Sequence, residues 1–233
     1  MEGGEGQRIV SRTSLIACLC FSTCWIVMGA ENSSKVLRRP LDLPSGGARG
    51  EHEEEENALE AIFFFGDTYE GDGFFFLLDR SGSMSGFKLA MLKTEMNSAL
   101  SELSPTSEFG IVSFSGDYSV FSPTPSRATS GMVAAAQAWV NAMEAAGSTM
   151  MLQAAQQLMP IVEISSRRDR RVIAVGDGSP NNPGHEETLA GILAANTQQL
   201  PIDTLLVGAN EPALLFMQQL ASDTGGTFRQ ISY

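Results

Sequence analysis

The feature that most constrains this chain is a run of five apolar residues, 74–78, that leads directly into Asp79, Ser81 and Ser83. An unbroken apolar run of this length is typical of a strand buried on both faces in a parallel sheet covered by helices. Asp79 would then lie just past the carboxyl end of that strand, where ligands bind in open α/β sheets. The three polar residues alternate, so an extended turn can direct their oxygens to one point.

Carboxylate and hydroxyl oxygens, without sulfur or imidazole, suit a hard divalent cation such as Mg²⁺. The alternative interpretation is a polar loop that caps the following helix, because Asp and Ser are good N-cap residues. The residues alone leave both interpretations open.

The sequence Asp79-Arg80-Ser81-Gly82-Ser83-Met84 after an apolar strand resembles the metal-ion-dependent adhesion site of von Willebrand factor type A domains. Residues 147–149 resemble the second loop of that site, with Thr149 as the matching residue. Residues 172–178 resemble the strand and Asp-Gly of its third loop, with Asp177 as the match and Gly176 standing where the family often has Ser or Thr. The resemblance covers residues 61–233.

This resemblance implies an α/β, doubly wound, mostly parallel six-stranded sheet in the order 3-2-1-4-5-6, with one short antiparallel edge strand and helices on both faces. It implies that Ser81 and Ser83 contact the cation directly, and that Thr149 does so directly or through water. Asp79 and Asp177 would lie mainly behind these hydroxyls. The expected ion is Mg²⁺, with Mn²⁺ and Ca²⁺ as alternatives.

Neutral hydroxyl ligands leave such an ion electrophilic, so a carboxylate supplied by a partner protein can take an open position. The expected function is therefore metal-dependent protein–protein recognition or adhesion. The expected partner-binding rim consists of other side chains on the same loops: Arg80, Met84, Ser148, Met150, Ser179, Asn181 and Asn182. The two methionines pack beneath the loops in the alternative interpretation.

Apolar periodicity indicates alternating strands and helices after the first loop. Helices are predicted over residues 87–103, 131–146, 149–164, 185–200 and 212–223, and strands over 108–115, 118–121, 171–176, 202–207 and 227–231. This alternation predicts a parallel sheet with right-handed crossovers and helices on both faces. Two Phe-rich runs, 62–66 and 74–78, are joined by a Gly/Asp connection and are predicted to enter the sheet next to one another.

The amino-terminal region is predicted to precede the folded domain. Residues 1–30 carry two arginines, an apolar stretch and small residues at the end, which is typical of a secretory signal peptide. An uncleaved membrane anchor is the alternative, and the mature chain is expected to start near Glu31. Residues 31–60 are rich in Pro, Gly and Glu and are predicted to form a flexible acidic linker. The domain itself is assigned to 61–233, and the chain is expected to be exported: extracellular, periplasmic or anchored facing outward.

Composition and charge limit which partners and which kinds of site this chain can have. The formal net charge is -12, which disfavours binding to nucleic acid or an anionic membrane surface. The three cysteines all lie in the first 30 residues, so the predicted domain has no disulfide or thiolate site. A structural envelope subunit with an incidental metal site is the main alternative, with the basic segment 165–171 as its docking patch.

A hydrolase that pairs Ser81 with His185 is a third alternative. The chain lacks a P-loop, a G-x-S-x-G elbow and an H-E-x-x-H motif. We therefore expect the protein not to be an enzyme.

Overall fold

The computed structural model describes residues 59–233, so the predicted signal segment and nearly all of the predicted linker lie outside the described residues. The strands are β1 (Glu60–Phe64), β2 (Asp67–Gly71), β3 (Gly73–Asp79), β4 (Glu108–Phe114), β5 (Tyr118–Val120), β6 (Ser126–Arg127), β7 (Arg170–Gly176), β8 (Ile202–Val207) and β9 (Phe228–Ile231). The helices are η1 (Gly82–Met84), α2 (Phe87–Glu102), α3 (Ser130–Asn141), α4 (Met151–Glu163), α5 (His185–Ala195) and α6 (Glu211–Thr224). Within residues 59–233, no helix has the length and hydrophobicity needed to cross a bilayer.

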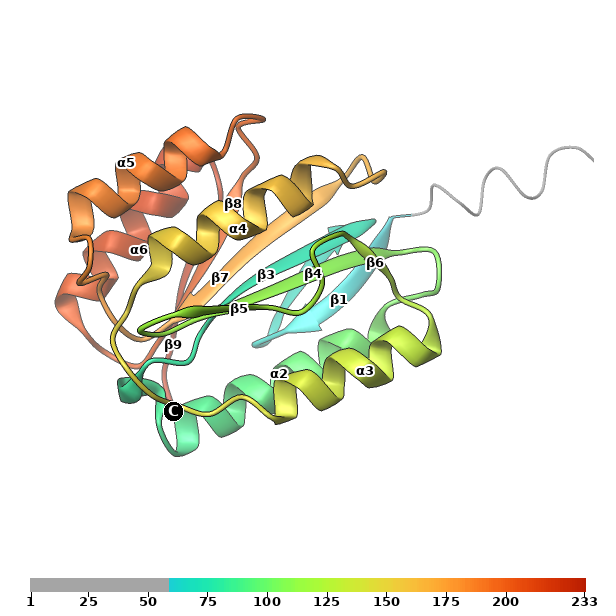
Figure 1. The fold of residues 1–233 in the computed structure, drawn as a ribbon, viewed down its shortest axis with the longest axis horizontal. Helices are drawn as coiled ribbons and strands as arrows, with labels where there is room; N and C mark the ends of the chain where they lie inside the picture. Colours follow the sequence, from blue (N-terminus) through green and yellow to red (C-terminus); the bar gives the residue numbers. More distant parts are fainter. Residues whose placement is uncertain (1–58) are drawn as a thin grey trace, which may run out of the picture. The chain divides into compact units, whose positions relative to one another are not determined.

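One mixed sheet forms the centre of this part of the chain (Figure 1). Its strand order is β5-β4-β3-β7-β8-β9, and β6 pairs with β4 outside this path. Strands β3, β4, β7, β8 and β9 run parallel, whereas β5 and β6 are antiparallel to β4. Counted from β3 and without the two-residue β6, the order is 3-2-1-4-5-6. The predicted fold class and strand order are confirmed, and β6 adds one short strand that was not predicted.

Helices cover the sheet on both faces, with α2 and α3 on one side and α4, α5 and α6 on the other (Figure 1). Strand β3 shows why the sequence requires this arrangement. Phe74, Phe76 and Leu78 point into the cluster that includes α2 and α3. Phe75 and Leu77 point into the cluster that includes α4, α5 and α6. All five side chains are at most 2% exposed, and burying each contributes about 1.5–3 kcal/mol.

The prediction for the segment before β3 was wrong in one respect. Residues 62–66 do not join the main sheet, because β3 already has β4 and β7 as its two neighbours. Instead β1 pairs with β2 in a separate antiparallel hairpin, with Ile62 opposite Tyr69. Phe65 and Gly66 form the turn at φ values of 52° and 84°, which suits a two-residue hairpin connection. The segment expected to be a connection is therefore itself a strand.

Two predicted helices are shorter than expected. The helix expected over residues 131–146 ends at Asn141, although alanine favours helix in the following stretch. There the backbone N–H of Ala146 donates instead to Arg80 O (3.0 Å), so the stretch runs as a loop beside the end of β3. The helix expected over 185–200 ends at Ala195 because the side chain of Asn196 turns the chain through hydrogen bonds with the backbone of Leu200.

The basic segment 165–171 is held by an acid at the amino-terminal end of β4. Glu108 accepts hydrogen bonds from Ser165 Oγ (2.6 Å), Ser166 Oγ (2.6 Å) and Ser166 N (3.1 Å), and Arg167 Nε lies 3.7 Å from its Oε1. Burial alone raises the pKa of Glu108, but the serine hydrogen bonds and the charge of Arg167 outweigh it and hold the pKa below its usual value. The start of this segment is thus fixed by a buried carboxylate.

We expect Glu108→Gln to lower the free energy of unfolding at pH 7 by about 1–3 kcal/mol, because charge-assisted hydrogen bonds become neutral ones. The pKa of Glu108 is lower in the folded than in the unfolded protein, so this contribution is complete above the unfolded value of about 4.3. It is lost as the pH falls through the folded value. Urea denaturation at pH 7 and in acid measures the loss of unfolding free energy and its dependence on pH.

The matched control is Glu187→Gln, which removes an exposed carboxylate on α5 and should have a much smaller effect. If Glu108→Gln lowers the free energy of unfolding as much in acid as at pH 7, the charge of Glu108 contributes nothing to stability.

Candidate metal centre

The five residues predicted to bind a cation lie on three loops at the carboxyl edge of the sheet. Asp79 ends β3 and precedes Ser81 and Ser83, Asp177 directly follows β7, and Thr149 lies shortly before α4. Because β3 and β7 are parallel neighbours, their carboxyl ends lie side by side (Figure 1). The topology therefore brings residues almost 100 positions apart to one edge.

Ser83 connects the first loop to the third. Its hydroxyl donates a hydrogen bond to Asp177 Oδ1 (2.7 Å) and lies 3.1 Å from Ser81 Oγ. The backbone N–H of Ser81 in turn donates to Asp79 Oδ1 (2.7 Å). Two hydroxyls and two carboxylates thus form one connected group, three of whose residues are at most 3% exposed: Asp79, Ser81 and Asp177.

Thr149 approaches this group from the second loop. Its backbone N–H donates to Asn181 Oδ1 (3.2 Å), and the backbone N–H of Asn181 donates to Thr149 O (3.3 Å). A Cβ placed on Gly178 would lie 3.1 Å from Thr149 Oγ1 and 3.8 Å from Ser83 Oγ. One point therefore lies close to both hydroxyls, and only a glycine leaves that point free.

Backbone hydrogen bonds tie the first and second loops together. The N–H of Gly82 donates to Gly147 O (3.0 Å), and the N–H of Ala146 donates to Arg80 O (3.0 Å). Gly147 has a φ of +72°, and a Cβ there would lie 2.8 Å from Gly116 N. A side chain at this position would be strained and would also collide with the backbone. The positions of the loops are thus fixed by backbone as well as side-chain contacts.

Asp79 is a fully buried carboxylate with an unpaired oxygen. Burial raises its pKa to about 7, although hydrogen bonding from Ser81 opposes the shift. Within the described part of the chain, Asp79 Oδ2 has no hydrogen-bond partner. A Cβ on Gly176 would lie 2.9 Å from this oxygen and 3.3 Å from Met217 Cε. Gly176 therefore gives the carboxylate its space, and a Ser or Thr there would require Asp79 or Met217 to move.

Lys88, in the first turn of α2, was not found by sequence reasoning. Its ammonium group forms an ion pair with Asp177 Oδ2. Burial alone lowers the pKa of Lys88, but the hydrogen bond and charge of Asp177 outweigh it and raise the pKa. The available signal was its position, because a cation near a helix N-terminus is unfavourable unless another group compensates it. Lys88 balances the charge of a buried acid in the group.

The residues predicted for the rim are placed differently from one another. Asn181 and Asn182 are exposed, and Ser148, Met150 and Ser179 are half-buried. Met84 is 0% exposed and packs in the core with α2, so it is corrected from a rim residue to a core residue, because η1 turns it beneath the loop. Arg80 points away from the cluster: its guanidinium forms an ion pair with Asp117, beyond the end of β4.

The Ser81–His185 pair considered for hydrolysis is not formed in the described residues. The His185 ring packs edge-on against Phe216 at 5.0 Å, whereas the Ser81 hydroxyl contacts Ser83. Among residues 59–233, no group of three or more His, Cys, Asp or Glu side chains is arranged to hold a metal ion.

Comparison with known proteins identifies the family. A family model for the von Willebrand factor type A domain matches residues 74–230. This chain belongs to that family. The match runs from β3 into β9, so it includes all three loops at the carboxyl edge of the sheet, whereas the β1–β2 hairpin precedes it.

One curated relative of this type A domain is inter-alpha-trypsin inhibitor heavy chain H4 from Homo sapiens. It is 26% identical over 167 residues, which is 67% of this chain but 18% of the human protein. The match therefore takes up less than a fifth of that relative.

Two solved structures show the same fold. The von Willebrand factor type A structure from Catenulispora acidiphila has a TM-score of 0.61 and 21% identity, and the match covers 71% of this chain and 40% of that one. The vWF domain of the type V pili tip protein Mfa5 from Porphyromonas gingivalis has a TM-score of 0.55 and 11% identity, with 73% and 90% covered.

We expect Lys88→Met to lower the free energy of unfolding in chelator by about 1–3 kcal/mol, because it leaves a buried oxygen of Asp177 without its partner. Urea denaturation measures this. Lys93→Met is the matched control: it lies on the same helix, and its ammonium donates to Asn141 O at the surface. Equal stability of the two variants would contradict a role for Lys88 in balancing Asp177.

Proposed function

We propose that this type A domain binds a divalent cation at the carboxyl edge of its sheet and uses it to recognise a protein that presents a carboxylate. The observation that carries this proposal is the connected group in which Ser81, Ser83 and Asp177 lie within hydrogen-bonding distance around the buried Asp79. Such a group is costly in free energy when it only packs, because an unpaired buried carboxylate oxygen loses its hydration. A cation compensates that cost.

The chemistry of the donor set fits Mg²⁺, with Mn²⁺ and Ca²⁺ as alternatives. Ser81, Ser83 and Thr149 would hold the ion through neutral hydroxyl oxygens. Asp79 and Asp177 would balance part of its charge, since Lys88 already pairs with Asp177. When bound, the ion supplies a coordination position for an oxygen from outside the domain. Asp79 Oδ2 supports the fit, because it is a buried acceptor that forms no hydrogen bond within residues 59–233.

The rim then selects the partner. Asn181 and Asn182 are exposed beside the third loop, and Asn181 also hydrogen-bonds Thr149. A partner that contacts Asn181 therefore touches a residue that positions one of the proposed cation ligands. This arrangement links recognition of the partner surface to the geometry of the ion.

A place outside the cytoplasm, either extracellular, periplasmic or anchored, is part of the proposal. The similar Mfa5 domain belongs to a pilus tip protein, and the predicted signal segment points the same way. An adhesion or envelope function fits both the similarity to Mfa5 and the predicted signal segment. No catalytic step is proposed.

Asp79→Ala is expected to weaken Mg²⁺ binding about 10- to 100-fold, the usual effect of removing a group that supports the ligands of a metal. Asp177→Ala should have a similar effect, and Thr149→Ala a smaller one. Titration calorimetry measures all three, with Asp223→Ala, an exposed acid on α6, as the control. The cooperative thermal transition should persist in chelator, because the core rests on the apolar strands and helices rather than on the ion.

Partner binding provides the decisive test. Pull-down of native surface proteins in Mg²⁺ should succeed, and the same pull-down in chelator or with Asp79→Ala should fail. Undiminished binding in chelator, or in both Asp variants, would overturn the proposal and favour a structural subunit that docks through another surface.

A further inference from the structure

The proposed cation site contains one basic side chain beside its two acids. Lys88 lies in the first turn of α2, shortly after the first loop, and its ammonium group pairs with Asp177 Oδ2. The other oxygen of this carboxylate, Oδ1, accepts a hydrogen bond from Ser83 Oγ (2.7 Å). The Asp177 side chain is only 1% exposed, so both of its oxygens are engaged by neighbours inside the protein.

These side chains leave an uneven charge around the site. With Asp79 and Asp177 ionised and Lys88 protonated, the three groups together carry one negative charge. A divalent cation would change that total to one positive charge, which these groups do not neutralise. A single carboxylate from outside the domain would bring the total to zero.

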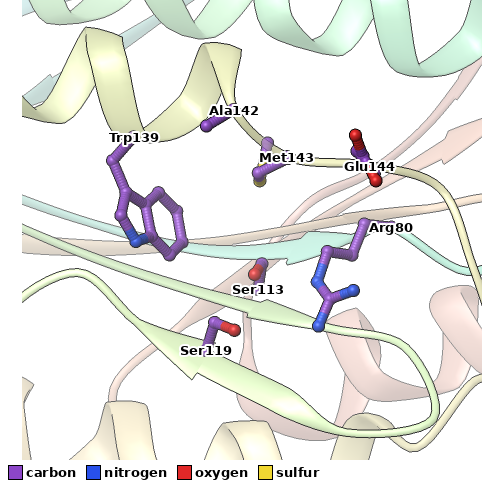
Figure 2. Close-up of a pocket in the computed structure, with 7 residues that line it drawn as sticks. All are labelled: Arg80, Ser113, Ser119, Trp139, Ala142, Met143 and Glu144. Carbon is purple, nitrogen blue, oxygen red and sulfur yellow. The ribbon is translucent and has the colours of Figure 1, made fainter.

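Arg80, on the first loop, does not share this role with Lys88. Its guanidinium pairs with Asp117, and its side chain lines the cavity between α3 and the β4–β5 pair (Figure 2). Glu144 borders the same cavity and is exposed, so water and salt screen its charge. The surplus positive charge of an ion-loaded site therefore depends on Lys88 rather than on Arg80.

The stem of Lys88 packs beside the loop that follows β8. A Cβ placed on Gly208 would lie 3.7 Å from Lys88 Cε and 3.4 Å from the Tyr233 ring, so these three residues approach one another closely. Tyr233 in turn contacts Phe87, with 5.4 Å between the ring centroids. The dipole of α2 places a further partial positive charge at the same end of the helix. Positive charge is thus built into this edge of the sheet.

We propose, on the basis of the function proposed above, that Lys88 sets the selectivity of the cation site. It weakens the binding of the divalent ion and strengthens the binding of a carboxylate to the ion-loaded site. The ammonium group repels a second cation that binds the same acids. Once the ion is present, the surplus positive charge attracts an anion and disfavours a neutral or cationic group. A lysine that only stabilised the fold would move both affinities in the same direction.

Lys88→Met in the full chain tests the effect on the ion. Titration calorimetry should show Mg²⁺ binding about ten-fold tighter than in the wild type, because a neighbouring positive charge is removed. Mg²⁺ should also raise the thermal midpoint more in Lys88→Met than in the wild type, since tighter binding to the folded state stabilises that state more.

Acetate, compared with acetamide as its neutral isostere, tests the effect on the carboxylate. Both are titrated into the Mg²⁺-saturated protein at constant ionic strength and followed by the amide NMR signals of the first and third loops. The wild type should bind acetate more tightly than acetamide. Lys88→Met should bind acetate about ten-fold more weakly than the wild type. Acetate binding should disappear in chelator, because the ion is part of the site.

Two further variants separate charge from packing. Lys88→Arg keeps the positive charge and should retain both preferences of the wild type. Lys93→Met removes a lysine of the same helix whose ammonium group donates to Asn141 O, and it should change neither affinity.

A role of Lys88 in selectivity is contradicted if Lys88→Met binds Mg²⁺ no more tightly than the wild type, if it binds acetate no more weakly, or if Lys88→Arg behaves like Lys88→Met. Any of these results, with a wild type that binds both Mg²⁺ and acetate, leaves the proposed function standing. If neither the wild type nor Lys88→Met binds Mg²⁺, the cation site itself is refuted, and this role of Lys88 with it.

Discussion

The burial of a carboxylate at the end of β3 is the constraint on which the rest of this structure depends. β3 is covered on both faces and flanked by two parallel strands, and Asp79 at its end is 0% exposed. An ionised group in that position is costly unless other groups compensate it. The Ser81 backbone N–H compensates one oxygen, and the space beside Gly176 accommodates the other. The surrounding loops are arranged to meet this requirement.

The sequence was sufficient to predict the parts of the fold that follow from hydrophobic pattern. The double-sided burial of β3, the parallel sheet with helices on both faces and the bounds of β8 came from unbroken apolar runs and their alternation with helices. The order of the strands came from the resemblance to the type A family. The hairpin before β3 was not predicted, because β2 is short and polar and resembles a turn. The shortened α3 was not predicted either, because Ala146 makes its hydrogen bond to Arg80, a partner distant in the chain that no local propensity reveals.

In the candidate site too, some residues could be predicted from the sequence, and others depend on contacts between residues far apart in the chain. Asp79, Ser81 and Ser83 could be found from the apolar strand that precedes them, whereas Thr149 and Asp177 were found through the resemblance to the type A family. Lys88 was missed because its importance depends on the position of Asp177, 89 residues away. Met84 and Arg80 were placed on the rim by proximity in sequence alone, whereas backbone direction decides where a side chain goes: η1 turns Met84 inward, and the ion pair with Asp117 draws Arg80 towards β5.

The backbone bonds between the first and second loops have a mechanical consequence. Gly82 and Arg80 are each joined to the segment around Gly147 by a main-chain hydrogen bond, so the two loops behave as one rigid piece rather than as independent arms. Displacing Thr149 then requires either that both bonds break or that the end of β3 moves too. Since β3 is the central strand, such a displacement would be resisted by the whole sheet. The third loop is attached to this piece by one main-chain bond, from Asn181 N–H to Thr149 O, and otherwise through side chains.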